Sequence, residues 1–359
     1  MDHLFSRRHA ACDGCCHQHL WRPAAHHHQS ETVTMKGDKL LSIKGLRVEF
    51  PTQDGPLVAV NDVDLDVTRG EVLGIVGESG SGKTVLGLSS MGLIDRPGRV
   101  TAGQVLFDGQ DVTNYPESGW RNIRGNRIAM IFQDPTTSLN PVQRIGAQMI
   151  EALQSHRDIS GDAARQIIRD AMVRVGINSP DERLDAYPHQ FSGGMRQRVV
   201  IAIALLNEPD LIIADEPTTA LDVTIQAQIL RDMRRLSRDT RTALIWVSHD
   251  LGVVAQIAQR VAVMYAGRIV ENGPTEKILK SPCHPYTQGL IASMPSNAPP
   301  GERLPSIPGG LPQLSNLPAG CSFAPRCVYA SSACNMMPEL IQTSSDHAVR
   351  CVSPLDEGS

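Results

Sequence analysis

The sequence predicts an α/β fold in which short buried strands alternate with helices, and three observations support that class. An apolar strand from Val72 runs into a glycine-rich turn and then into the start of a helix. A second apolar run, residues 210–216, ends in two carboxylates, and a third, 243–247, leads into Ser248-His249-Asp250. Open α/β sheets bind their ligands at such strand ends, so these ends are the candidate site.

The glycine-rich turn, residues 77–84, fits the phosphate-loop pattern G-x-x-x-x-G-K-[ST]. Its glycines let the backbone curl so that successive N–H groups point inward, and the following helix adds its positive dipole end. Lys83 supplies a point charge for the β- and γ-phosphates, and the Thr84 hydroxyl can ligate Mg²⁺. The predicted nucleotide-binding residues of the loop are Gly77, Ser79, Gly80, Ser81, Gly82, Lys83 and Thr84.

The composition is that of a soluble globular chain, with 41% apolar and 20% charged residues among 359. A net charge of −4 gives no basic footprint for nucleic acid, and 4% aromatic residues give no base-stacking surface. The longest apolar run, residues 199–206, is far shorter than the roughly 20 residues of a membrane span. Any membrane role therefore needs a partner.

Residues 1–34 differ from the rest, because they hold seven of the twelve histidines and three of the eight cysteines. The stretch 12–19, together with residues 26–28, could bind metal. The segment has no apolar periodicity that would let it pack. We therefore expect it to be disordered, or to be a leader that is read through in error with Met35 as the start.

Apolar periodicity and turn residues predict the elements around the loop. The expected strands are 40–50, 58–67, 103–107 (in a hairpin that turns at Asp108-Gly109) and 128–132. The expected helices are 84–93, a helical stretch over 142–176 that stops at Gly176, and 195–206. Phe50 could stack on an adenine ring or belong to ordinary strand core, and the sequence leaves both open.

Acidic and polar side chains follow the buried strands. Asp215 is placed to reach Mg²⁺, and Glu216 to reach a water beside the γ-phosphate. Ser192-Gly193-Gly194 stands at the start of an apolar helix, where it is either a second anion site or an ordinary serine N-cap. Residues 219–222 are expected to cap the next helix.

The order of these motifs resembles the ATP-binding subunit of an ABC transporter. The phosphate loop, Gln133, Ser-Gly-Gly, Asp215-Glu216, Asp222 and His249 follow one another as in that family, over about residues 40–278. The resemblance implies a P-loop NTPase core of the ABC type with an antiparallel β subdomain, a helical signature subdomain and a small Cys/Pro-rich C-terminal extension. One departure is Phe191-Ser-Gly-Gly-Met195, where the family usually has Leu-Ser-Gly-Gly-Gln. The residues that would touch phosphate are kept.

The resemblance also implies a role for each residue. Thr84 and Gln133 would hold Mg²⁺, and Asp215 would hold it through water. Glu216 would be the general base, and His249 would clamp both the γ-phosphate and Glu216. Ser192 and Gly194 would bind the γ-phosphate of a second subunit, so that the active unit would be a dimer. The implied catalytic set is Glu216, His249, Gln133 and Lys83, and the nucleotide-binding set adds Phe50, Ser192, Gly193, Gly194 and Asp222.

Three further stretches, 132–141, 191–198 and 284–290, look like the dipeptide/oligopeptide and nickel importer branch, as does the tail from Cys321. That branch implies an ATPase for peptide uptake at the cytoplasmic face of the inner membrane. Its partners would be a related second ATPase subunit, two permeases and an extracytoplasmic peptide-binding protein, with no nucleic acid. Nickel or a glutathione-like peptide is an alternative cargo. A soluble ABC protein acting on nucleic acid or ribosomes is disfavoured, because the chain has one phosphate loop and no sustained heptads.

The expected domains are the N-terminal 1–34, an ATP-binding domain over 35–280 with its helical part at about 134–205, and an extension over 281–359. The extension is Pro-rich, with no evident core of its own, and contains Cys321, Cys327, Cys334 and Cys351. No C-x-x-C pair is present, so the usual structural-zinc spacing is absent, and a reducing compartment disfavours a disulfide. The residues leave three states open, namely unpaired thiols, zinc, or a [4Fe–4S] cluster, whose ligand spacing is freer. The resemblance favours the cluster, because importers that share this tail pattern carry one.

Overall fold

A computed structural model describes residues 38–219, 221–295 and 304–356 of the chain. The predictions for residues 1–34, which concern disorder, a misread leader and metal-binding histidines, lie outside the described residues.

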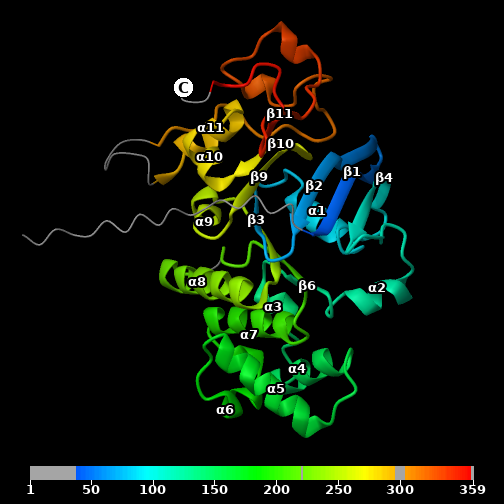
Figure 1. Ribbon diagram of the computed structural model, residues 1–359, viewed down its shortest axis with the longest axis vertical. Helices are drawn as coiled ribbons and strands as arrows, with labels where there is room; N and C mark the ends of the chain where they lie inside the picture. Colours follow the sequence, from blue (N-terminus) through cyan, green and yellow to red (C-terminus); the bar gives the residue numbers. More distant parts are fainter. Residues whose placement is uncertain (1–37, 220, 296–303, 357–359) are drawn as a thin grey trace, which may run out of the picture. The chain divides into compact units, whose positions relative to one another are not determined.

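Five parallel strands form the centre of the larger sheet, in the order β9-β3-β8-β7-β6. Figure 1 labels β9, β3 and β6 of this set. Their bounds are β3 Val72–Val76, β6 Ile128–Ile131, β7 Leu211–Asp215, β8 Ala243–Ser248 and β9 Arg260–Tyr265. Every residue of β3, β7 and β8 is buried, as parallel strands with both faces covered require. The strands predicted before the phosphate loop, Glu216 and His249 are confirmed, and their carboxyl ends lie along one edge of the sheet.

A second, antiparallel sheet has the strand order β2-β1-β4-β5. Its strands are β1 Lys39–Thr52, β2 Gly55–Thr68, β4 Arg99–Phe107 and β5 Gln110–Asp111. The predicted strands 40–50, 58–67 and 103–107 are confirmed, and each runs further than expected. The turn between β4 and β5 is Asp108-Gly109, whose φ angles of 52° and 77° are the left-handed values of a two-residue hairpin.

The single helical stretch predicted over 142–176 is wrong, because the chain forms two helices there. Helix α4 spans Ile145–Gln154 and α5 spans Gly161–Arg174. The polar residues between them break the helix, and Ser160 caps α5 by accepting a hydrogen bond from Ala163 N at 3.4 Å. Gly176, with φ 76°, follows the end of α5 as predicted.

Two other helices have ends that differ from the prediction. Helix α1, Lys83–Ser89, stops short of residue 93, because the chain turns at Gly92 with φ 61°. Helix α7, Gly193–Leu205, begins two residues early, because Ser192 caps it by accepting from Met195 N at 3.3 Å. Further helices are α2 Glu117–Ile123, α3 Pro135–Ser138, α6 Pro180–Leu184, α8 Val223–Thr240 and α9 Leu251–Ala255.

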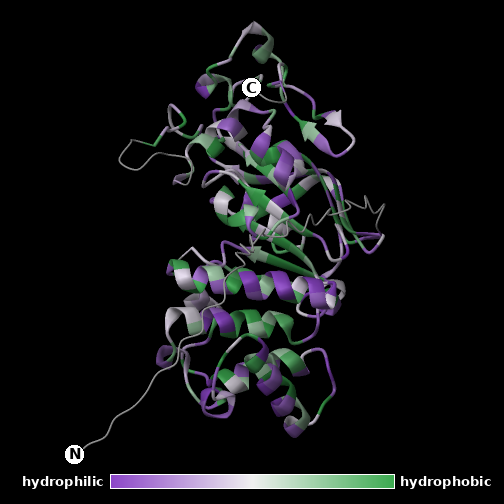
Figure 2. Cartoon of the chain, turned by 60° about the vertical axis from the view of Figure 1, so that its left-hand side comes forward, coloured by the Kyte–Doolittle hydropathy of each residue, from purple (hydrophilic) through white to green (hydrophobic). Residues whose placement is uncertain are grey.

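Helix α7 connects the helical part to the sheet. It contacts α4 and α5 on one side and β6 on the other, and eight of its residues are buried. Met149 of α4, Ile168 of α5 and Val199 of α7 share one hydrophobic core with β7 and β8. Figure 2 shows hydrophobic residues gathered on the central strands, with many hydrophilic residues along α8. In the part of the chain that the structure describes, no helix has the length and apolar character needed to cross a bilayer.

The described tail residues Tyr286 and Phe323 belong to the hydrophobic core of the larger sheet, and the tail adds two strands to that sheet. Strand β10, Arg268–Pro274, pairs with β9, and the short β12, His347–Val349, pairs with β10. Strand β11, Ile341–Ser344, completes this edge. All three pairings are antiparallel, so the sheet is mixed rather than wholly parallel.

A buried polar network fixes the tail to β10. The Glu271 carboxylate accepts hydrogen bonds from the Cys283 and His284 amides at 2.6 and 3.0 Å, and lies 2.8 Å from His347 Nε2. His284 caps α11, Pro285–Ala292, by accepting from Tyr286 N at 3.0 Å. Burial lowers the pKa of His284 to about 4, so its ring is neutral, as this acceptor role requires. Helix α10, Thr275–Lys280, packs on β10.

Candidate functional site

The phosphate loop joins β3 to α1, and its curl depends on two glycines. Gly77 and Gly82 have φ angles of 156° and 101°. A Cβ at Gly77 would lie 2.2 Å from the Met264 carbonyl oxygen, and one at Gly82 would lie 2.4 Å from that of Ala59. Larger residues are therefore excluded both by φ and by contact with neighbouring backbone.

Lys83 is the first residue of α1, and its ammonium group is buried inside the loop. Nζ donates to the carbonyl oxygens of Gly77 at 2.8 Å and Glu78 at 2.9 Å. Burial lowers the pKa of Lys83, whereas the charges of Glu216, Asp215 and Glu78 act to raise it. The Lys83 ammonium group thus lies close to three carboxylates, in the position predicted for binding phosphate.

Asp215 ends β7 and is 4% exposed. The Thr84 side chain lies close to its carboxylate, and Oδ1 has no hydrogen-bond partner among the described residues. Burial raises the pKa of Asp215, the Thr84 hydrogen bond and the Lys83 charge lower it, and the Glu216 charge raises it further. A buried carboxylate oxygen without a partner, beside a threonine hydroxyl, fits the oxygen ligand set that Mg²⁺ prefers.

Three side chains lie within hydrogen-bond distance of the Glu216 carboxylate. Its Oε2 atom lies 3.2 Å from Gln133 Nε2, 3.1 Å from Thr219 Oγ1 and 3.2 Å from His249 Nδ1. Gln133 follows β6 and His249 follows β8, so the ends of three neighbouring strands meet here. The Glu216 backbone has φ 46°, a strained value for a non-glycine residue that is often found at functional sites.

The structure therefore brings the predicted catalytic and metal residues into one site. Lys83 provides a cation, Thr84 and Asp215 place side-chain oxygens near it, and the Glu216 carboxylate lies within 3.2 Å of Gln133 and His249. The Glu216 side chain is 15% exposed and that of His249 is 51% exposed, so a water could reach the acid from the histidine side. Such a site can hold nucleotide phosphates with a divalent cation and activate water.

Other predicted residues lie outside this cluster. Ser192 and Gly193 are exposed, and no hydrogen bond within the described residues joins 192–194 to the phosphate loop. The Asp222 carboxylate caps α8 by accepting from Ile225 N at 3.0 Å. The partly buried Phe50 ring packs on Gly98, where an added Cβ would lie 2.4 Å from the ring.

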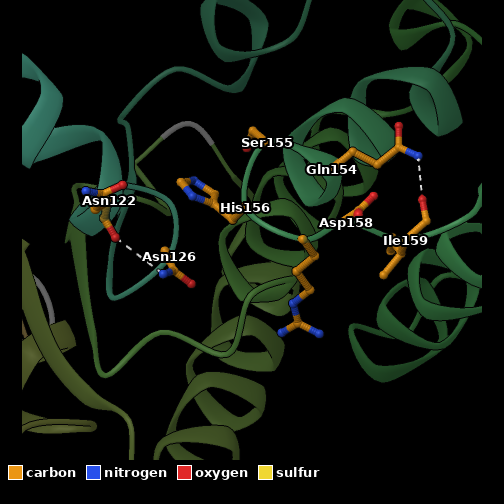
Figure 3. A pocket seen from close by; sticks show the side chains of 8 residues that line it. Asn122, Asn126, Gln154, Ser155, His156, Asp158 and Ile159 are labelled. Carbon is orange, nitrogen blue, oxygen red and sulfur yellow. Dashed lines mark hydrogen bonds between the residues drawn. The ribbon is translucent and has the colours of Figure 1, made fainter.

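A polar cavity of about 410 Å³ lies at the opposite end of β6 (Figure 3). Asn122, Asn126, His156 and Asp158 are among its lining residues. Asn126 precedes β6 and Gln133 follows it, so this cavity is separate from the catalytic cluster.

Comparison with known proteins decides the family. Residues 60–219 match the ABC transporter family, and residues 270–334 match the C-terminal region of oligopeptide/dipeptide transporters. The dipeptide transport ATP-binding protein DppD of Escherichia coli is 47% identical over 319 residues, which cover 89% of this chain and 98% of DppD. The chain is an ABC transporter ATPase.

Further relatives agree with this ABC ATPase assignment. A Brucella ovis protein whose name describes a peptide import ATP-binding protein is 50% identical over 331 residues, covering 89% of the chain and 98% of the relative. A solved dimeric ATP-binding cassette bound to ADP and Pi superposes with a TM-score of 0.59 at 26% identity, covering 66% of this chain and 98% of that one. The ABC ATPase thus binds and hydrolyses ATP with Mg²⁺ and works with membrane permease subunits.

The tail cysteines of the ABC ATPase lie near one another. Burial raises the pKa of the Cys321, Cys327 and Cys351 thiols, and the other tail cysteines raise that of Cys351 further. The backbone N–H groups of Phe323, Tyr329 and Ser353 act to lower the pKa of Cys321, Cys327 and Cys351, respectively.

The spacing of these sulfur atoms is wider than a zinc site needs. Within the described residues, three metal-ligating atoms come within 4.8 Å of one another only at Glu271, Cys283 and His347. The hydrogen bonds of Glu271 described above account for that trio. A tetrahedral zinc with Zn–S bonds near 2.3 Å would hold its sulfurs about 3.8 Å apart. The tail cysteines therefore do not form a ready-made zinc site.

Sequence reasoning missed three residues that contact this site. Thr219, three positions after Glu216, was assigned only to a helix cap, although its hydroxyl reaches Glu216. Glu78 was treated as a variable position of the loop, yet its side chain pairs with Arg326 of the tail. The signal for Arg326 was a lone charge between Cys321 and Cys327, and nothing in the sequence indicated its partner.

Proposed function

We propose that this ABC ATPase hydrolyses ATP to drive the uptake of dipeptides and oligopeptides. The observation that carries the proposal is the match of residues 270–334 to the C-terminal region of oligopeptide/dipeptide transporters. The printed names of relatives such as DppD describe the same cargo. Nickel and glutathione-like peptides are the other cargoes to be tested.

The proposed catalytic roles agree with the contacts around Glu216. Lys83 and the loop amides would hold the β- and γ-phosphates, and Thr84, Gln133 and, through water, Asp215 would hold Mg²⁺. Bound Mg²⁺ supplies charge neutralisation between the phosphates. Glu216 accepts a proton from the attacking water, and His249 keeps Glu216 and the γ-phosphate in place. The 3.2 Å contacts of Glu216 with Gln133 and His249 support these roles, because a general base needs a fixed orientation.

The residues outside the cluster are proposed to act in a dimer. Ser192, Gly193 and Gly194 are proposed to bind the γ-phosphate held by a related second ATPase subunit, with Asp222 nearby. Their exposure supports this, as do the dimeric cassettes that the chain is similar to. Phe50 is proposed to border the adenine, because its ring is only partly covered.

The proposed transporter places two such ATPase subunits under two permeases at the cytoplasmic face of the inner membrane. An extracytoplasmic protein delivers the peptide, and nucleic acid has no part. We divide the chain into an N-terminal segment, an ATP-binding domain over 35–280 with a helical part at about 134–205, and an extension over 281–359. The contacts that join α4, α5 and α7 support the helical part.

Uptake by the assembled transporter tests this function. Proteoliposomes that contain the ATPase, its partner ATPase and both permeases should accumulate labelled dipeptide when ATP and the binding protein are supplied. Proteoliposomes with non-hydrolysable ATP are the control. Accumulation of nickel but not of peptide would replace the proposed cargo, and ATP-independent accumulation would remove the coupling.

We further propose that Cys321, Cys327, Cys334 and Cys351 hold a [4Fe–4S] cluster. The support is that the other three tail cysteines lie near enough to Cys351 to raise its pKa, and that four thiolates can bind the four irons of such a cluster. The cluster would be a structural staple, since metal binding contributes directly to folding free energy. The backbone bond from Cys321 N to Cys334 O, at 2.9 Å, already closes this segment.

Anaerobic purification should give a brown protein with about four irons and four sulfides per chain, as this cluster type requires. Cys327→Ser should lose the colour and make the tail sensitive to proteolysis. Ser331→Ala, which leaves all four thiols in place, is the matched control. A colourless anaerobic sample with stoichiometric zinc would contradict the proposal.

A further inference from the structure

Arg326 of the tail forms an ion pair with Glu78, a residue of the phosphate loop. Arg326 Nη1 lies 2.7 Å from Glu78 Oε2, and Nη2 lies 3.0 Å from Glu78 Oε1. Such a bidentate pair fixes both the position and the orientation of the carboxylate. The Arg326 residue is 7% exposed, and its Nε donates to Pro308 O at 2.9 Å. The guanidinium is thus held from the tail side as well.

The main chain of Glu78 is also tied on both sides. Its N–H donates to the Tyr286 hydroxyl of α11 at 2.9 Å, and its carbonyl accepts from Lys83 Nζ at 2.9 Å. Glu78 therefore connects the tail directly to the lysine that binds phosphate. A shift of the Glu78 side chain would move the carbonyl that orients Lys83.

Aromatic packing also involves the short segment between Cys321 and Cys327 that contains Arg326. Phe323 packs on Tyr265 and Tyr286 with ring centroids 5.3 and 5.4 Å apart. Phe323 and Arg326 both lie between Cys321 and Cys327, within six residues of chain. A ligand that fixes the positions of Cys321 and Cys327 would therefore also restrict the positions of Phe323 and Arg326.

The Glu78–Arg326 ion pair also affects the charge that the phosphate loop presents to ATP. A carboxylate inside a loop that binds ATP repels the phosphates, and at this depth solvent screens that repulsion only partly. Arg326 offsets that charge by pairing with both Glu78 carboxylate oxygens. Other contacts already join the tail to the rest of the chain: Arg350 donates to Ile269 O at 3.1 Å, and Lys277 pairs with Asp346 at 2.6 Å. An ion pair that served only to attach the tail would therefore not need to lie at the phosphate loop.

We propose that Arg326 is a positioning residue of the ATP site, which neutralises Glu78 and holds the phosphate loop in its binding shape. The segment between Cys321 and Cys327 then sets the ATP affinity of the loop. The role of Arg326 stands on these contacts alone. Its dependence on what the cysteines bind rests on the proposed cluster.

ATP affinity of the anaerobically purified full chain tests the proposal. Arg326→Ala should raise the Kd for MgATP about 10-fold, the scale of one lost charge-assisted pair. Adding Glu78→Gln to that variant should restore most of the affinity, because the unpaired carboxylate is gone. Asp346→Asn, which breaks a tail ion pair away from the loop, is the matched control and should leave the Kd unchanged. Thermal unfolding of each variant separates a loss of fold from a loss of binding.

Two results would overturn the role of Arg326. One is a wild-type Kd for a folded Arg326→Ala variant, and the other is a double variant that binds no better than Arg326→Ala alone. Cys327→Ser tests the link to the cysteines, and it should weaken MgATP binding by a similar factor. Wild-type binding by a Cys327→Ser protein that has lost iron would remove that link. Absence of iron from the wild type would instead contradict the cluster and leave the Arg326 result standing.

Discussion

Glu216→Gln should still bind MgATP, while its ATP hydrolysis in the assembled transporter falls by at least about 100-fold, the usual contribution of a general base. Glutamine keeps the size and the contact with Gln133 Nε2, which is 3.2 Å from Glu216 Oε2. It cannot accept the proton of the attacking water. The loss should therefore appear in kcat and not in the Kd for ATP.

Phosphate release and ATP binding, measured on the same preparation, check this expectation. Glu182→Gln, an exposed position of α6, is the matched control and should hydrolyse ATP at the wild-type rate. Wild-type turnover by Glu216→Gln would show that another group activates the water. A loss of ATP binding equal to the loss of turnover would instead make Glu216 a binding residue.

Lys83→Ala should abolish both steps. The variant loses a side chain that bonds the Gly77 and Glu78 carbonyls from within the loop, at 2.8 and 2.9 Å. It also leaves Glu216 and Asp215 without the cation that faces them. Because the phosphates then meet uncompensated acids, we expect the Kd for MgATP to rise roughly 100-fold or more, the effect of about two charge-assisted interactions.

Titration of the full chain with MgATP measures this effect. Lys44→Ala, at an exposed position of β1, removes one lysine without touching the loop and should bind as the wild type does. Tight ATP binding by a folded Lys83→Ala protein would contradict the proposed role of this lysine. If turnover alone were lost, Lys83 would act on the transition state only.

The catalytic cluster could be predicted because its signals are local. The phosphate loop needs glycines at fixed spacing, and the acids at 215 and 216 directly follow a buried strand, so short stretches determine both. Parallel packing then brings the strand ends together without further sequence information. Gln133 and His249 lie next to Glu216 for that reason.

What could not be predicted depends on contacts between distant segments. Glu78 and Arg326 are 248 residues apart, and either one alone reads as an ordinary surface charge. Strands β11 and β12 are four and three residues long, so backbone pairing makes them strands rather than their own pattern: β12 pairs with β10, and β11 pairs with β12. The break between α4 and α5 lies in the polar stretch 155–160, which contains no glycine or proline to mark the end of a helix.

The pairing of β12 with β10 bears on how the protein is made. A ribosome completes β10 long before it reaches residue 347, so the nascent sheet has an open edge for that interval. Open edges pair readily with other chains, and Glu271 of β10 lacks its contact with His347 until synthesis nears its end. A chain that terminates before Arg326 would expose the unpaired edge of β10 and would also lack the Glu78–Arg326 ion pair at the phosphate loop. We expect chaperones and proteases to recognise such a chain.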